Sequence, residues 1–159
     1  MNRSNEPRSK LLTIVEKITA IIDAEKKKIT NRELLELCAA SGMPSLSNDP
    51  HLCHEIAEVA INYLIRSEYG EDLLSSVHPA TTCAEILRPL QKRFPTQSWR
   101  SETQITYQQF STPTSIAYLA AYLLSLTDTD TVLEPSCGTG SLAVWALSAG
   151  ATVVSNEID

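Results

Sequence analysis

A turn that contains two glycines is the part of this sequence best suited to hold a ligand. The turn spans residues 134–140, has the sequence Glu-Pro-Ser-Cys-Gly-Thr-Gly, and directly follows the apolar residues Val132 and Leu133. Because glycine lacks a Cβ, Gly138 and Gly140 let the backbone approach a ligand closely and adopt dihedral angles that other residues avoid. A helix that starts after such a turn points its unpaired backbone amides at the bound group. The turn therefore predicts a site for a nucleoside-bearing cofactor.

Two acidic residues narrow the choice of cofactor. An acid that binds two ribose hydroxyls is expected about 20 residues after such a turn. Glu157 fits this place, with Asp159 just behind it. Glu134 would repel the pyrophosphate of a dinucleotide, whereas S-adenosylmethionine carries an ammonium and a sulfonium group that Glu134 would attract. Spacing alone leaves NAD open, because Ala143 stands where dinucleotide motifs accept glycine or alanine.

The segments around the turn predict one strand–helix–strand unit. Residues 131–133 form a short apolar run, residues 141–148 a helical segment, and residues 151–155 a second β-rich run. Two strands joined in this way pair in parallel, with a right-handed crossover. Upstream, Thr112 and Pro113 open another helix, since proline is tolerated in the first turn. We expect that helix to carry a continuous apolar stripe made of Ile116, Leu119, Ala120, Leu123 and Leu124.

The beginning of the chain predicts two helices separated by a charged break. Apolar residues recur at helical spacing over residues 11–22. Thr30 and Glu33 fit a capping box, in which the threonine caps an exposed backbone amide and the glutamate reaches back to the threonine. The helix that starts there should stop at Gly42, because glycine suits the backbone conformation of a helix end.

Two further helices are expected before residue 100. The pattern over residues 51–67 predicts a strong amphipathic helix that ends at Gly70. Residues 82–92 predict another helix, which Pro89 should bend or end early. After residue 95 the sequence becomes polar and loses its period, so we place a domain boundary near residue 100.

Composition and charge exclude several classes of protein. Of the 159 residues, 43% are hydrophobic and 20% are charged, as in folded globular proteins. The net charge of -6 argues against this chain gripping nucleic acid by itself. A modest basic cluster is best interpreted as a solvated helix face, and it consists of Arg88, Lys92, Arg93 and Arg100. No run reaches the about 18 apolar residues that cross a bilayer, and the polar start is not a secretory signal, so we expect a cytoplasmic protein without membrane contact.

The cysteines and histidines indicate no metal centre. The four cysteines form no CxxC pair, so we expect reduced, mostly buried thiols. His51 and His54 are the one plausible ligand pair, and no second pair follows them.

Two motifs carry a resemblance to a known family. Residues 133–140 resemble the first motif of S-adenosylmethionine-dependent DNA methyltransferases, especially those that modify exocyclic amines such as that of adenine. Residues 110–113, with the sequence Phe-Ser-Thr-Pro, resemble the F-x-T-P element that precedes this motif in the same enzymes. Bacterial proteins of the strawberry-notch type carry a similar pair. The resemblance covers residues 105–159 and does not extend to residues 1–100.

The resemblance implies a role for each residue of the two motifs. The methionine end of the cofactor would be lined by Phe110, Thr112 and Pro113. The floor beneath it would be formed by Glu134, Ser136, Cys137 and Gly138, and the same cofactor-binding turn includes Pro135 and Gly140. Glu157 would bind the ribose hydroxyls, and Ile158 would pack on the adenine.

Plain structural roles remain open for some of these residues. Phe110 also fits a buried loop aromatic, and Cys137 a small buried filler without a redox role. Glu134 and Glu157 also fit solvated carboxylates at the ends of strands.

The periodicity of the first hundred residues and the resemblance of the last part together predict an α/β fold in two regions. Residues 1–100 would form a mostly helical region. Residues 101–159 would form the first βαβ unit of a Rossmann-like methyltransferase sheet, which two strands leave incomplete.

The catalytic element of the family, N/D-P-P-Y/F, does not occur in these 159 residues. Residues 48–51, Asn-Asp-Pro-His, are the nearest match, but they lack the second proline and the aromatic ring that stacks on a flipped base. We therefore expect no catalytic residue here. The chain is predicted to be the N-terminal fragment of a nucleic-acid methyltransferase, inactive alone, whose full-length form binds DNA. The alternative is a non-catalytic module that binds a protein partner, or itself, through an open sheet edge.

Overall fold

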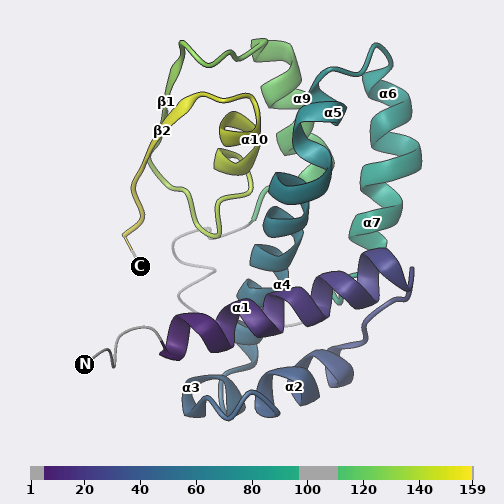
Figure 1. Ribbon diagram of the computed structural model, residues 1–159, viewed down its shortest axis with the longest axis vertical. Coiled ribbons are helices and arrows are strands. Elements are labelled where there is room, and N and C mark those ends of the chain that lie inside the picture. Colours follow the sequence, from purple (N-terminus) through teal and green to yellow (C-terminus); the bar gives the residue numbers. More distant parts are fainter. Residues whose placement is uncertain (1–5, 97–110, 159) are drawn as a thin grey trace. The chain divides into compact units, whose positions relative to one another are not determined.

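The computed structural model describes residues 6–96 and 111–158 (Figure 1). Its fold is mixed α/β, mostly helical, with one small parallel sheet of two strands. Within these ranges no helix combines the length and the apolar character needed to cross a membrane. The boundary expected near residue 100 lies outside the described residues and stays a prediction.

The chain divides into two compact units by its internal contacts. The first unit comprises Met1–Ile61 and Lys92–Ser98. The second comprises Asn62–Gln91 and Trp99–Asp159. It contains both strands and the turn of residues 134–140, the glycine turn.

The first unit is helical. Its elements are α1 (Glu6–Thr19), the π-helical η1 (Ala20–Ala24), α2 (Asn31–Ala39), α3 (Pro44–Ser47) and the first part of α4 (Pro50–Leu64). The side chains of Ile18, Ile22 and Leu34 are fully buried and form the centre of its core. The helical spacing over residues 11–22 is confirmed, because α1 and η1 together cover that segment.

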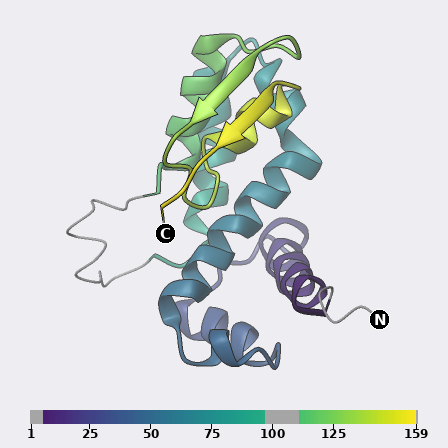
Figure 2. The same cartoon turned by 90° about the vertical axis from the view of Figure 1, so that its left-hand side faces the viewer.

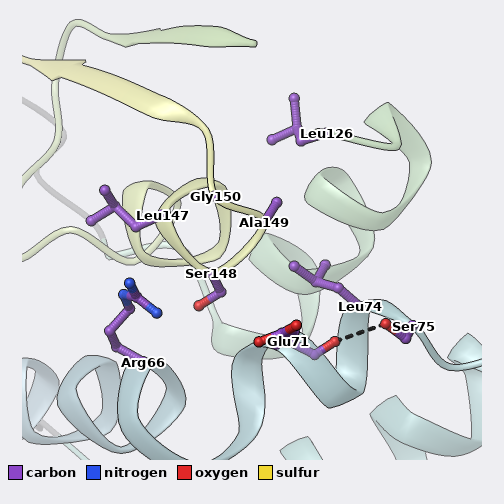
Figure 3. Close-up of a pocket in the computed structure, with 9 residues that line it drawn as sticks. All are labelled: Arg66, Glu71, Leu74, Ser75, Leu126, Leu147, Ser148, Ala149 and Gly150. Carbon is purple, nitrogen blue, oxygen red and sulfur yellow. Dashed lines mark hydrogen bonds between the residues drawn. The ribbon is translucent and has the colours of Figure 1, made fainter. Parts of the chain in front are cut away.

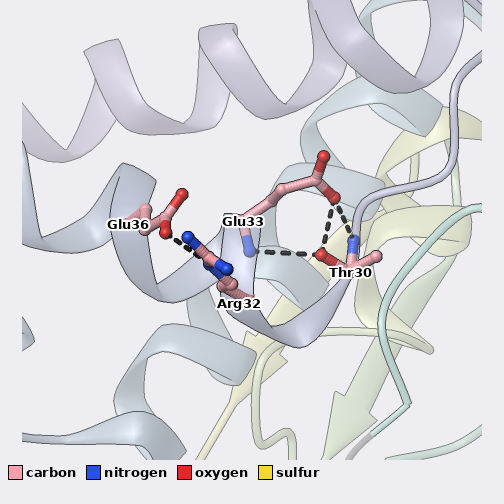
Figure 4. Close-up of polar contacts among 4 residues, drawn as sticks. All are labelled: Thr30, Arg32, Glu33 and Glu36. Atoms are coloured by element: carbon pink, nitrogen blue, oxygen red, sulfur yellow. Dashed lines mark hydrogen bonds and ion pairs between the residues drawn. The ribbon is translucent and has the colours of Figure 1, made fainter.

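The predicted capping box is confirmed at the start of α2 (Figure 4). The backbone amide of Glu33 donates to Thr30 Oγ1 at 3.3 Å, and the amide of Thr30 donates to Glu33 Oε2 at 2.7 Å. The hydrogen bonds from Thr30 lower the pKa of Glu33, because they stabilise its ionised form. Two donors that the helix cannot pair by itself are thereby satisfied. α2 ends at Ala39, shortly before Gly42, whose φ is +68°.

Gly70 does not end the helix that precedes it, so that prediction is wrong. After α4 the chain continues through the π-helical η2 (Ile65–Tyr69) into α5 (Gly70–Leu74), and Gly70 itself has a helical φ of -58°. The reason is tertiary packing. A Cβ on Gly70 would overlap the side chain of Ser148, so glycine is needed there for close approach of two helices.

The helix expected over residues 82–92 runs on through Pro89. Its parts are α6 (Pro79–Thr81), the π-helical η3 (Thr82–Leu87) and α7 (Arg88–Lys92). The wider π-helical turns lie directly before the proline, where an α-helix would lose a hydrogen bond and meet the proline ring. The change of helix type thus replaces the predicted bend or stop.

The sheet consists of β1 (Thr131–Glu134) and β2 (Thr152–Ser155), with α10 (Ala143–Ser148) between them in the chain. The strands are parallel, as predicted, in a register that runs from Thr131 opposite Thr152 to Glu134 opposite Ser155. Figure 2 shows the two strands side by side and pointing the same way. α10 packs against both strands.

Helix α9 (Thr114–Leu124) forms where it was predicted, but it buries a different face. Leu123 and Leu124 of the expected stripe are 80% and 67% exposed. The buried side of α9 consists of Thr114, Ser115, Ala117, Tyr118 and Ala121. Tyr118 anchors this side. Its hydroxyl donates to the Leu73 carbonyl at 2.9 Å, and the centroid of its ring lies 5.1 Å from the ring centroid of Trp145.

Candidate functional site

The backbone of the glycine turn has the conformation that requires glycine. Gly138 has φ +48° and Gly140 has φ +90°, both in the region that other residues rarely adopt. Among the described residues, none has an atom within 4 Å of a Cβ built on Gly138, so this part of the structure leaves open space over the residue. That space is available to a ligand. The turn also delays the next helix, since α10 begins at Ala143 rather than at Ser141.

Asn156 ties the turn to the end of the second strand. Its backbone carbonyl accepts a hydrogen bond from the Cys137 amide at 3.0 Å, and its own amide donates to the Glu134 carbonyl at 2.9 Å. Its side-chain Nδ2 donates to the Pro135 carbonyl at 3.2 Å. The bond from the Asn156 amide continues the parallel ladder beyond the strands, and the other two bonds hold the turn against the residue that follows β2. Asn156 was not among the predicted site residues, although its place directly before Glu157 was a usable signal.

Glu157 lies against the turn. Its Oε2 accepts a hydrogen bond from the Gly138 amide at 2.6 Å, and its Oε1 accepts one from the Ile158 amide at 2.9 Å. The acid after β2 and the glycine after β1 are therefore in direct contact at the carboxyl ends of both strands. In parallel sheets, ligands bind in the crevice beyond these ends.

The remaining residues of the turn differ in exposure. Glu134 and Cys137 are half-buried, whereas Pro135 and Ser136 are exposed. The buried thiols are Cys38, Cys53 and Cys83, as expected, and burial raises the pKa of Cys38 to about 12. Glu134 and Cys137 are therefore partly accessible at the turn.

Asn62, near the end of α4, also contacts the turn. Its Nδ2 donates to the Thr139 carbonyl at 2.8 Å, although the two residues are 77 positions apart. Both belong to the second unit. Nothing in the local sequence around Asn62 signals this contact.

The upstream motif lies only partly within the described residues. Thr112 is half-buried and Pro113 exposed, and the Pro113 carbonyl accepts hydrogen bonds from the Ile116 and Ala117 amides at the start of α9. Neither residue forms a hydrogen bond to the turn within the described ranges. Phe110 lies outside these ranges, so its predicted role stays a prediction.

The predicted adenine contact, Ile158, is 89% exposed beside Glu157. Its apolar side chain is accessible to a ligand at the ends of the strands. Asp159 lies outside the described residues.

A separate pocket of about 400 Å³ opens beside α10 (Figure 3). It is lined by Arg66, Glu71, Leu74, Ser75, Leu126, Leu147, Ser148, Ala149 and Gly150. Figure 3 shows the Arg66 side chain directed toward α10. None of the predicted cofactor residues within the described ranges lines this pocket, so it is distinct from the glycine turn.

Asp49, the nearest match to a catalytic acid, has a structural role. Its Oδ1 accepts a hydrogen bond from the Leu52 amide at 3.1 Å, which caps the start of α4. Within the described ranges, no three His, Cys, Asp or Glu side chains are grouped so that they could hold a metal ion.

No protein-family model, curated protein or solved structure matches this chain. A function is therefore inferred from the geometry of the turn and of the residues that hold it.

Proposed function

We propose that the glycine turn and the two strand ends of the second unit bind S-adenosylmethionine. The chain would then supply the cofactor-binding part of a methyltransferase that acts on an exocyclic amine of nucleic acid, with adenine in DNA as the first choice. The observation that carries this proposal is the 2.6 Å hydrogen bond from the Gly138 amide to Glu157. It supports the proposal because it brings the glycine turn into contact with Glu157, the acid expected to bind the ribose hydroxyls.

Glu157 has the chemistry to hold a ribose. An ionised carboxylate is a pure hydrogen-bond acceptor with two oxygens, which suits it to the paired hydroxyl donors of a ribose. In this structure Glu157 accepts from the Gly138 and Ile158 amides, so both oxygens lie at the turn and the strand end. Hydrogen bonds to a charged acceptor contribute about 1.5–3 kcal/mol each. Two ribose hydroxyls bound here would lie next to the open space over Gly138.

Glu134 favours a cationic ligand over a dinucleotide. Two unit charges 4 Å apart interact by about 4 kcal/mol near a protein surface, and by about 1 kcal/mol in bulk water. A half-buried carboxylate lies between these limits. The interaction stabilises a bound ammonium or sulfonium and disfavours a pyrophosphate by a comparable amount.

The role proposed for this chain is to bind and orient. S-adenosylmethionine supplies an electrophilic methyl group when it is bound. The residues present would fix the cofactor for in-line attack by an amine, through proximity and orientation.

Calorimetric titration of the full chain tests the proposal. We expect S-adenosylmethionine to bind and NAD not to bind. Glu157→Gln should weaken binding about tenfold or more, because a charged acceptor is replaced by a neutral one. The matched control is Glu85→Gln, which changes an exposed acid of η3 and should leave the affinity unchanged. Tighter binding of NAD, or no binding of S-adenosylmethionine, would contradict the proposal.

A second candidate function is self-association through the sheet. Leu133 and Val154 lie opposite each other in the register and are 70% and 53% exposed. Within the described residues each strand also pairs on one side only. An unpaired strand edge can pair with the same edge of a second copy about a two-fold axis.

Sedimentation velocity separates the two functions. Association that increases with concentration, is abolished by Leu133→Lys and occurs without cofactor binding would favour the second. A chain that stays monomeric and binds S-adenosylmethionine would exclude it.

A further inference from the structure

The turn is held from two directions. From the strand side, Asn156 and Glu157 bond the amides of Cys137 and Gly138. From the helix side, Asn62 of α4 bonds the carbonyl of Thr139, the residue between the two glycines. The same Asn62 amide lies 4.0 Å from the position that a Cβ of Gly140 would occupy.

A hydrogen bond to the Thr139 carbonyl restricts the orientation of a whole peptide plane in the turn. The carbonyl belongs to the peptide plane between Thr139 and Gly140, so fixing it also fixes the direction of the Gly140 amide, which donates to the Cys137 carbonyl at 2.7 Å. Glycines on both sides of this residue leave the free chain with wide conformational freedom. A side chain anchored on a helix reduces that freedom before any ligand arrives.

We propose that Asn62 is a positioning residue of the S-adenosylmethionine site, which holds the glycine turn in its ligand-binding conformation. This inference rests on the proposed function. Asn62 acts through the turn and does not itself contact the cofactor. Its contribution is preorganisation, because a turn that is already ordered loses less entropy when the ligand binds.

Two variants of the full chain test the role of the Asn62 amide. Asn62→Ala removes the donor, and Asn62→Asp replaces it with a group whose proton is present only at low pH. The matched control is Asn48→Ala, which removes an exposed asparagine at the end of α3. Two quantities are measured: the hydrogen exchange of the turn amides without ligand, and the affinity for S-adenosylmethionine.

For Asn62→Ala we expect faster exchange at the Gly138 and Gly140 amides and an affinity about tenfold lower. Asn62→Asp should bind more weakly still at neutral pH, because its carboxylate faces the Thr139 carbonyl oxygen. As pH falls toward the pKa of the new acid, near or above about 4, the protonated carboxyl becomes a donor and its affinity relative to Asn62→Ala should rise. The ratio of the two affinities removes pH effects that both variants share.

The outcomes are distinguishable. If the unmodified chain binds and Asn62→Ala equals it in both affinity and exchange, the positioning role is overturned and the proposed function stands. If the unmodified chain does not bind S-adenosylmethionine, the proposed function fails, and the exchange rates alone show whether Asn62 orders the turn. If circular dichroism shows that Asn62→Ala is unfolded, the pH dependence of Asn62→Asp relative to the unmodified chain decides: a flat relative affinity overturns the role.

Discussion

His54 is a buried ionisable residue whose charged form the fold opposes. Its side chain lies in the first unit and is 6% exposed. Burial lowers the pKa of His54, and the nearby His51 lowers it further. In the unfolded chain the pKa of His54 is about 6.5, so His54 binds a proton more readily there than in the folded chain. Above about pH 6.5 neither state is protonated there, and as pH falls below it the free energy of unfolding decreases.

We predict that His54→Gln reduces the loss of stability between pH 7 and pH 5. The His54 contribution to that loss is at most about 1.4 kcal/mol per pH unit, the value for one proton. Urea unfolding at both pH values measures it, and His78→Gln, at an exposed histidine, is the control. An equal loss in His54→Gln and in the unmodified chain would show that His54 is not the titrating group.

Contacts between individual residues were predictable from the sequence where the two residues lie close together along the chain. The capping box joins Thr30 to Glu33 within one turn, so its spacing in the sequence contains all the information. Glu157 could be placed because strand–helix–strand geometry fixes where the second strand ends. Asn62 could not, because its partner Thr139 is brought near only by the tertiary fold.

At the scale of elements, Gly70 shows tertiary packing overriding a local signal. Glycine usually marks a helix end, and its helix propensity is about 1 kcal/mol poorer than that of alanine. In this fold it lies inside a helical stretch against Ser148, whose hydroxyl donates to the Val144 carbonyl at 2.9 Å.

We predict that Gly70→Ala destabilises the chain, although alanine is the better helix former. The added methyl group would overlap Ser148, and overpacking of this kind costs about 1–3 kcal/mol, more than the propensity gain. Urea unfolding measures the difference. In the double variant Gly70→Ala/Ser148→Gly the cost of the alanine should largely disappear, measured against Ser148→Gly alone. Additive costs would contradict a direct contact between these residues.

Helix α9 shows the limit of hydrophobic periodicity. The apolar stripe ending in Leu123 and Leu124 is a valid helical pattern, yet the fold buries the side that carries Tyr118. Two sides of this helix are apolar enough to pack, and the sequence of the helix alone does not say which one meets a neighbour. The choice follows from the contacts of Tyr118 with Leu73 and Trp145, which are distant in sequence.

At the scale of the whole molecule, the order of elements around the turn was predictable and their surroundings were not. Strand, turn, helix and parallel strand follow from apolar runs and glycine positions, and the register confirms the pairing. The π-helical segments were not predicted, because hydrophobic periodicity does not report helix type; of these segments, η3 lies directly before Pro89. The two compact units meet in the chain after Ile61, inside the continuous helix α4. Nothing in the sequence pattern marks this boundary.

Binding of S-adenosylmethionine at the glycine turn is the central claim, and amide chemical shifts of the ¹⁵N-labelled full chain test it most directly. As the cofactor is added, we expect the largest shifts at the Cys137, Gly138 and Ile158 amides, because these lie at the two strand ends around Glu157. Gly42, in the first unit, should remain unchanged and is the internal control. Absence of shifts at saturating cofactor, or shifts confined to the pocket around Gly150, would contradict the claim.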